Sequence, residues 1–293
     1  MTNTVAKTAK GWLALIIMSV LAVLFILPIL VVFTNSFMSG FEIVNRYTPL
    51  TRPGNMHFVD ENVHFARITL IPNFATLRQY AALFFGHPQY MSFFWNSVAL
   101  VTPIVLGQVL ISFPAAYAFE MSHFKYKEAV FFIYIVVMLL PLQVTLVPNF
   151  IMADWLGIHG SRLAIILPGI LSPFGVFLMR QFLRNMIKEY VEAAQIDGAG
   201  YLGTLVMVVA PLVKPAIAAL MLLSFVENWN LVEQPRIFLT ALQEPLSLYL
   251  AQMAGQHLDM IFAASFFYLL PCVLIFLLGQ DAMVEGIQLS GIR

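Results

Sequence analysis

Charged residues are scarce in this sequence. Of its 293 residues, 10% are charged and 60% are hydrophobic, whereas soluble domains average about 25% charged and about 45–50% apolar residues. Soluble enzymes, nucleic-acid-binding proteins and disordered scaffolds need a large charged surface or an excess of one sign, and here 15 Lys and Arg residues balance 15 Asp and Glu residues. The composition argues against all three classes and indicates an integral membrane protein.

Cysteine and the common catalytic motifs are also missing or rare. The single cysteine, Cys272, cannot form an internal disulfide, and one thiol cannot build a zinc framework or a redox pair. The chain has no Gly-Lys dipeptide and therefore no Gly-Lys-Ser/Thr phosphate loop, and it also lacks His-Glu-x-x-His and Gly-x-Ser-x-Gly. We expect no enzymatic activity, no metal site and no cofactor in this chain.

Long apolar stretches are abundant, and six of them are long enough to cross a bilayer, which takes ~20 residues in a helix. The expected spans are residues 12–33, 93–119, 129–150, 163–178, 205–226 and 260–278. The first exceeds the ~7–15 apolar residues of a signal peptide. Ten prolines lie in or at the ends of these stretches and predict bent helices. The expected fold is an all-α membrane protein, with residues 1–293 forming one domain of six kinked transmembrane helices.

The distribution of lysine and arginine predicts the orientation, because loops on the cytoplasmic side carry the excess. The set of segments that includes both termini holds nine of these residues, among them every lysine, and the other set holds six arginines in longer loops. We therefore expect both termini in the cytoplasm, an external loop over residues 34–90 and a cytoplasmic loop over residues 180–204.

Ionisable residues are almost absent from the expected spans. Lys214 is the clearest case, and beside Pro211 and Pro215 near the cytoplasmic end it can extend to the membrane surface. A coupling site for ions needs a charge or an unwound helix near the midplane. The sequence therefore disfavours an ion-coupled secondary transporter, which stays the alternative function, and an intramembrane enzyme is less favoured still.

Several polar residues could line a path through the bent helices. In the third span these are Gln143 and Asn149, and at the outer end of the fifth span they are Glu227, Asn228, Trp229 and Asn230. For Gln143 and Asn149, hydrogen bonds between neighbouring helices are the favoured explanation. We treat them as possible contacts of a passing solute.

The expected cytoplasmic loop contains a short amphipathic helix. From Arg184 to Gln195, apolar residues recur at helical spacing with charged residues between them, and the run ends at Asp197-Gly198-Ala199-Gly200, where glycine permits a tight reversal. A surface helix in a protein with no energy source of its own is suited to docking a cytoplasmic motor. The alternative is a helix lying among lipid headgroups.

This loop resembles the EAA loop of permease subunits of bacterial ABC importers. That pattern is followed by Glu192-Ala193-Ala194, then three intervening residues and Gly198, then nine intervening residues and Val208-Val209-Ala210-Pro211. Val208 stands in place of Ile and Ala210 in place of Leu. The run Asp197–Gly200 is typical of the carbohydrate-uptake branch. Further similarities extend from about Asn73 to the C-terminus, and the closest type is the smaller six-span permease of the maltose importer.

The resemblance implies a multi-pass permease of the bacterial inner membrane that forms half of a carbohydrate pathway. Its partners would be a second homologous permease, two ABC ATPase subunits that bind ATP and Mg, and an extracytoplasmic solute-binding protein, which the polar residues of the fifth span could touch. The residues implied in ATPase coupling are Glu192, Ala193, Ala194, Asp197, Gly198, Gly200 and Pro211. The sequence does not reveal which carbohydrate is carried, and the segment 39–71 resembles nothing familiar, although four arginines tilt the external loop slightly toward basic.

Overall fold

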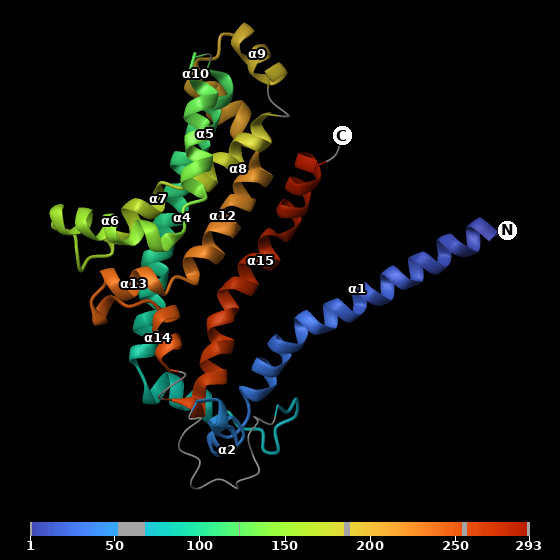
Figure 1. Ribbon diagram of the computed structural model, residues 1–293, viewed down its shortest axis with the longest axis vertical. Coiled ribbons are helices and arrows are strands. Elements are labelled where there is room, and N and C mark those ends of the chain that lie inside the picture. The colour runs from blue at the N-terminus through green and yellow to red at the C-terminus, as the bar shows by residue number, and fades with distance from the viewer. Residues whose placement is uncertain (1, 52–67, 123, 185–187, 254–256, 292–293) are drawn as a thin grey trace. The chain divides into compact units, whose positions relative to one another are not determined.

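The computed structural model describes residues 2–51, 68–122, 124–184, 188–253 and 257–291 (Figure 1). Over these ranges every regular element is a helix, which confirms the expected all-α class. The chain divides into two compact units. Unit 1 comprises Met1–Tyr90 and Leu250–Leu269, and unit 2 comprises Met91–Tyr249 and Leu270–Arg293.

Four of the described helices are long and apolar enough to cross a membrane. They are Ala14–Asn35, Gln89–Met121, Leu163–Arg184 and Leu258–Asp281. Two further pairs qualify only together: Lys127–Met138 with Leu142–Trp155, bent by 99°, and Tyr201–Leu212 with Lys214–Trp229, bent by 78°. Counting each pair as one span gives six candidates, the number expected from the sequence.

Proline accounts for both sharp bends. Pro141 lies between α5 (Lys127–Met138) and α6 (Leu142–Trp155) with an extended backbone at ψ 144°, and Figure 1 shows α6 turned away from the direction of α5. In the second pair, Val213 breaks the helix between Pro211 and Pro215. Proline has no N–H to donate and its ring clashes with the preceding turn, so the helix cannot continue straight.

Unit 1 combines the N-terminal part of the chain with a segment close to its C-terminus. Its elements are α1 (Thr2–Asn35), α2 (Gly40–Thr51), α3 (Arg78–Ala81), η1 (Ala82–Gly86), η4 (Leu258–Met260) and the start of α15 (Ile261–Gly291). A small core of Met38, Ile43 and Tyr47 packs against Leu258 and Phe262. This core holds α2 against η4, which lies far along the sequence from it. In the hydrophobic part of α1 the side chains are exposed, as lipid contact requires.

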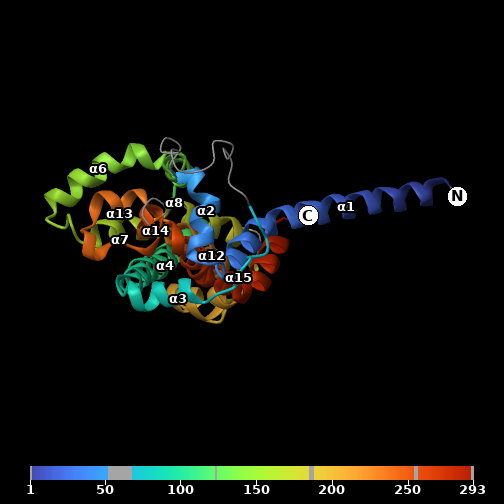
Figure 2. The same ribbon diagram turned by 90° about the horizontal axis from the view of Figure 1, so that it is seen from below.

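Unit 2 contains most of the remaining helices. They are α4 (Gln89–Met121), α5, α6, α7 (Leu163–Ile170), α8 (Pro173–Arg184), α9 (Lys188–Ile196), α10 (Tyr201–Gly203), η2 (Thr204–Val209), α11 (Ala210–Leu212), α12 (Lys214–Trp229), α13 (Glu233–Phe238), η3 (Ala241–Gln243) and α14 (Leu246–Met253). The unit boundaries fall at the start of α4, within α14 and within α15. One buried cluster joins α4, α5, α8, η2 and α12, with Tyr117, Met179, Val209 and Leu220 among its members. A second joins α4, α7 and α13, and Figures 1 and 2 show α6, α7 and α13 side by side.

Close approach of α4 to α7 and α8 depends on glycine. A Cβ added at Gly175 would lie 2.5 Å from the Ser112 Oγ, and one at Gly107 would lie 2.6 Å from the Cγ1 of Ile170. Helices in lipid gain no hydrophobic driving force from one another, so small residues that bring the backbones together supply the packing. These contacts fix α8, the helix that leads to the surface helix α9.

Candidate functional site

The helix α9 confirms the short surface helix expected from the loop sequence. It covers Lys188–Ile196, and the three residues before it, which include two apolar residues of the expected pattern, lie outside the described residues. Figure 1 shows α9 beside α10 at one end of unit 2.

Gly198 ends α9 in a geometry that only glycine adopts readily. Its φ is +82°, in the left-handed region. The Gly198 N–H donates to the carbonyl oxygen of Gln195 at 3.0 Å, and the Ala199 N–H donates to that of Ala194 at 2.9 Å. This pair of bonds is the Schellman arrangement, which satisfies carbonyls that the helix end would otherwise leave free. The tight reversal expected here is therefore present.

Gly200 does not share this requirement. Its φ of −73° and ψ of 166° form an extended backbone that any residue can adopt, and no neighbouring atom would lie within 4 Å of a Cβ added there. Its carbonyl oxygen accepts the N–H of Thr204 at 2.9 Å and so begins the next helical stretch. The sequence interpretation assigns the turn to both glycines, whereas the backbone needs only Gly198.

One face of α9 is packed onto unit 2. Val191 is buried in the same cluster as Leu205 and Val209 of η2, and Ala194 is also buried. The α9 helix is therefore held by η2, which is the segment leading to Pro211. Ala194 serves this inner contact and is not on the open surface.

The opposite face of α9 is open and partly apolar. Glu192, Ala193 and Asp197 are exposed. Large apolar side chains beside them are exposed as well, with Ile196 at 86% and Leu202 of α10 at 71%. Tyr190 of the apolar pattern is 53% exposed, whereas its neighbour Val191 is buried in the cluster with η2. Exposed apolar residues gathered in this way mark interaction surfaces. We call the exposed face made by Tyr190, Ala193, Ile196 and Leu202 the α9 face.

The possible solute contacts do not form one cluster in the described part of the chain. Asn228 and Trp229 are buried, and the Asn228 side-chain amide donates to the Ser224 carbonyl at 2.7 Å while Trp229 stacks on Phe225 at 5.2 Å. Trp229 also meets the ring of Phe94 of α4 edge-on at 5.8 Å, so both residues lie inside the unit.

The other candidates of this set lie nearer the surface. Glu227 and Asn230 are exposed, and Asn230 donates to the carbonyl of Val226. Gln143 is exposed and its side-chain amide donates to Glu233 of α13 at 3.3 Å, and Asn149 is half-buried. Among these six residues, Gln143, Glu227 and Asn230 are the ones that are exposed.

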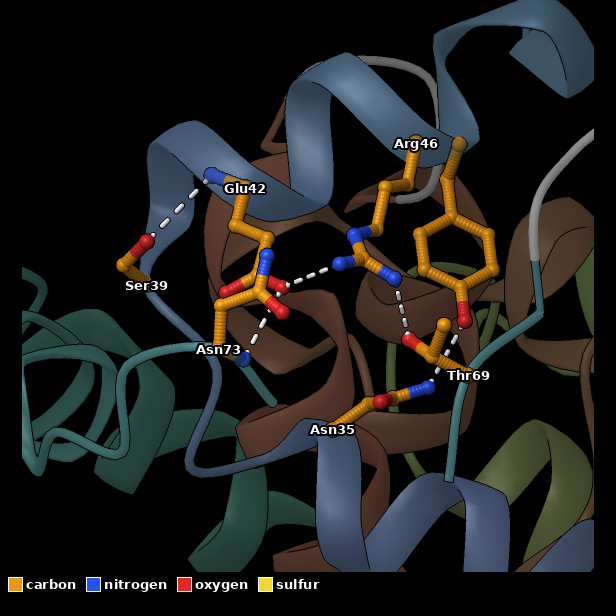
Figure 3. A network of polar contacts seen from close by, with 7 residues as sticks. Asn35, Ser39, Glu42, Arg46, Thr69 and Asn73 are labelled. Atoms are coloured by element: carbon orange, nitrogen blue, oxygen red, sulfur yellow. Dashed lines mark hydrogen bonds and ion pairs between the residues drawn. The ribbon is translucent and has the colours of Figure 1, made fainter. Parts of the chain in front are cut away.

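A polar network that the sequence did not predict fastens α2 within unit 1 (Figure 3). The Arg46 guanidinium pairs with Glu42 at 2.8 Å and donates to the Thr69 hydroxyl at 2.7 Å, and Glu42 also accepts the N–H of Asn73 at 3.1 Å. Glu42 is buried. Arg46 therefore links α2 to the segment that follows it and is not a free cation in the external loop; Arg52 and Arg67 lie outside the described residues.

The same network reaches the end of α1. The buried side chain of Asn35 donates to the Tyr47 hydroxyl at 2.7 Å, and Gln79 donates to the Asn35 carbonyl at 2.9 Å. Burial raises the pKa of Tyr47, with hydrogen bonds opposing that shift, so the hydroxyl stays protonated and neutral around pH 7. Part of the unfamiliar segment 39–71 is thus an ordered support at the end of α1.

A second unexpected feature is a buried arginine at the end of unit 2 that leads into α9. Arg180 of α8 is 6% exposed and pairs with Glu128 of α5 at 2.6 Å and with Glu120 of α4 at 3.5 Å. The sequence alone presents it as one more cation of a cytoplasmic loop. The signal that could have indicated burial is its position inside an apolar helical run, residues 173–183.

Within the described residues, no group of three or more His, Cys, Asp or Glu side chains is placed to hold a metal ion. The α9 face is the part of the described geometry that points to a function: an exposed apolar surface on a unit that contains helices long and apolar enough for a membrane.

Comparison with known proteins agrees with this geometry. The family model described as "Binding-protein-dependent transport system inner membrane component" matches residues 108–287, which include α9 and its turn. The arabinooligosaccharides transport system permease protein AraQ of Bacillus subtilis (strain 168) is 29% identical over 226 residues, 76% of this chain and 80% of that protein. The sn-glycerol-3-phosphate transport system permease protein UgpE of Escherichia coli O1:K1 / APEC is 29% identical over 240 residues, 78% of this chain and 85% of that protein.

A solved structure shares the fold. It is a chain of a bacterial ABC transporter involved in the import of the acidic polysaccharide alginate, with a TM-score of 0.74 and 21% identity, and the match covers 95% of this chain and 98% of that one. The family match spans well over half of the sequence and takes in both the bent helices and the surface helix. The chain therefore belongs to the family of binding-protein-dependent transport system inner membrane components.

Proposed function

We propose that this chain is the transmembrane permease subunit of an ATP-driven ABC importer for a carbohydrate, and that the α9 face docks on a cytoplasmic ATPase subunit. The observation that carries the proposal is α9 itself: an exposed helix with an open apolar face, closed by a left-handed glycine, within the region that defines the family. Covering apolar area that is open to water in the isolated chain lowers the free energy, and this favours binding of a partner.

The roles of the site residues follow from their exposure. Glu192 and Asp197 are placed to meet basic or hydrogen-bonding groups of the ATPase, and Ala193 permits close approach of the backbones. Ala194 packs α9 onto η2, and Gly198 sets the direction of the chain after it. ATP-driven closure of the ATPases would displace α9 and, through η2 and Pro211, the bent helix pair that begins at Tyr201.

The remaining partners complete the transporter. We propose a second homologous permease, two ABC ATPase subunits that bind ATP and Mg, and an extracytoplasmic solute-binding protein, assembled in the bacterial inner membrane. Both termini and α9 would face the cytoplasm, because the segments on that side contain every lysine of the chain. Gln143 of α6, Glu227 and Asn230 would be the residues that stay most open to solute or binding protein.

The substrate class rests on the relatives. AraQ is named for arabinooligosaccharides, and the chain with the shared fold comes from an importer of alginate, an acidic polysaccharide. An oligosaccharide is therefore the proposed cargo. The pairing of Arg46 with Glu42 removes one of the four arginines that could have favoured an anionic sugar, so the described structure supports no preference for a charged over a neutral one.

The proposal is tested in two steps. First, the tagged chain is captured from native membranes, and mass spectrometry should find an ABC ATPase and a second permease with it. Second, cells are given radiolabelled arabinotriose, alginate trisaccharide, sn-glycerol 3-phosphate and leucine. Uptake of an oligosaccharide that stops when the partner ATPase is deleted supports the proposal. Leucine uptake, or oligosaccharide uptake that survives the deletion and stops with a protonophore, contradicts it, the latter in favour of an ion-coupled transporter.

Two variants localise the coupling. Glu192→Lys and Gly198→Asp, both inserted in the membrane at normal levels, should lose the ATPase on capture and lose uptake. The matched control is Asp154→Lys, which makes the same charge change at an exposed carboxylate at the end of α6. Retention of ATPase and uptake by both α9 variants would show that the ATPase docks elsewhere.

A further inference from the structure

Arg180 of α8 is surrounded by groups from two other helices, α4 and α5. Its Nη2 donates to the Glu128 Oε1 at 2.6 Å, and its Nε lies 3.5 Å from the Glu120 Oε2, an ion-pair distance without a hydrogen bond. The guanidinium also lies over the ring of Phe131, 3.9 Å from the ring centroid, and 5.9 Å from that of Phe119. One side chain of α8 thus contacts the last turn of α4 and the first turn of α5.

Arg180 also lies one turn before the end of α8, the helix that leads to α9. The two carboxylates belong to opposite sides of the short connection between α4 and α5. We infer that Arg180 is a positioning residue that joins the ends of α4, α5 and α8 into one body, so that displacement of α9 moves all three helices together. This inference rests on the proposed function, in which α9 receives the motion of an ATPase.

The chemistry of the cluster suits a rigid connection better than a surface ion pair. The guanidinium is planar and always charged, and it can bond to carboxylates in its plane while it stacks on an aromatic ring. Arg180 and Glu120 are both more than nine-tenths buried, so water screens their attraction poorly. The Glu128 side chain is 72% exposed but accepts a hydrogen bond from the buried cation. The packing of α5 on α8 continues the contact along the helices.

Apolar packing also links α9 to these helices. The inner face of α9 is buried on η2, and Val191 and Val209 share one buried cluster with residues of α4, α5, α8 and α12. Arg180 adds to this packing the charged contact that joins α8 directly to α4 and α5.

The first test separates coupling from folding. Glu128→Gln leaves the shape of the side chain and removes its charge, and Arg180→Met leaves a flexible apolar chain. Each is assembled in proteoliposomes with the second permease, the ATPases and the solute-binding protein, and uptake of the radiolabelled panel is measured together with ATP hydrolysis. We expect ATP hydrolysis and capture of the ATPase to be retained while uptake per ATP falls by about 2- to 30-fold, the range of ordinary coupling energies. Asp154→Asn, at an exposed carboxylate, is the control.

The second test restores the connection with a covalent bridge. In a Cys272→Ser background, Arg180→Cys and Glu128→Cys are combined and joined after assembly with ethanediyl bismethanethiosulfonate. A rigid joint predicts low uptake per ATP before bridging and recovery after it, and reversal with a reducing agent. A merely structural arginine would give no recovery, because the bridge is added after folding.

The outcomes are distinguishable. Bridging that abolishes uptake would mean that the contact must open during transport, and unchanged uptake per ATP in Glu128→Gln and Arg180→Met would mean that the contact carries no motion; either result overturns the inference. If the unsubstituted chain captures no ABC ATPase or imports no member of the panel, the proposed function itself fails.

Discussion

Replacing Gly198 with alanine should open the turn that ends α9. The residue has a φ of +82°, and no atom outside its neighbours lies within 4 Å of an added Cβ, so the substitution adds strain but no clash. Holding an L-residue in the left-handed region costs roughly 1–2 kcal/mol. A cost of 1–2 kcal/mol changes an equilibrium ratio by a factor of about 5–30. We expect that change in the ratio of chains with the turn at Gly198 formed to chains with it open.

The assay is hydrogen exchange of the amides that close the turn. The N–H groups of Gly198 and Ala199, which donate to Gln195 and Ala194, should lose protection by about 5–30-fold in Gly198→Ala, and capture of the ATPase should fall with it. Gly200→Ala is the matched control, because the φ of Gly200 is −73° and its surroundings are equally open. Gly198→Asn should lie between the two, since asparagine tolerates this region better than alanine. Equal effects of Gly198→Ala and Gly200→Ala would refute the reasoning.

Three further predictions concern packing and surface. Gly175→Ala would place a Cβ 2.5 Å from the Ser112 Oγ and should destabilise unit 2 by about 1–3 kcal/mol. The melting temperature in detergent should fall, and adding Ser112→Ala to the same chain should partly restore it. If Ser112→Ala restores nothing, the strain lies elsewhere. Glu42→Ala leaves the Arg46 cation without its 2.8 Å partner and should lower the free energy of unfolding by about 1.5–3 kcal/mol. The double variant with Arg46→Ala should lose less than the sum of the two single losses. Strictly additive losses would mean that the ion pair contributes nothing to stability. Ile196→Asp, at a side chain 86% exposed, should leave the melting temperature unchanged but reduce capture of the ATPase; a large drop in melting temperature would show that Ile196 belongs to the core of the fold.

Local features of the site could be predicted from the sequence because neighbouring residues determine them. The spacing of apolar residues predicted α9, and the Asp-Gly run predicted the reversal, since the conformation of Gly198 depends on its own missing side chain and on hydrogen bonds within the same short segment. The prolines likewise predicted that helices bend. The angle of a bend, 99° at Pro141, depends on what each half packs against and could not be read from the sequence.

Burial of polar groups was the part that sequence could not supply. Arg180 reads as a loop cation because its partners, Glu120 and Glu128, are more than 50 residues away and meet it only when α4, α5 and α8 pack. Arg46 lies one turn from its partner Glu42, but Thr69, which it also contacts, and Asn73, which contacts Glu42, lie beyond a segment with no recognisable pattern. Asn228 and Trp229 are buried although their position at the end of a span suggested an open mouth, because sequence spacing does not tell which side of α12 faces inward.

The two faces of α9 give this transporter freedom to change partners. Val191 and Ala194 secure the helix to η2, while Tyr190 and Ile196 are exposed and take no part in that buried cluster. On the proposed function, selection on the outer positions alters which ATPase the chain accepts without loss of the fold, whereas the inner positions change only together with η2. On the proposed function, related permeases in one cell could share a single ATPase, or exclude a foreign one, through a few substitutions on a single turn of helix.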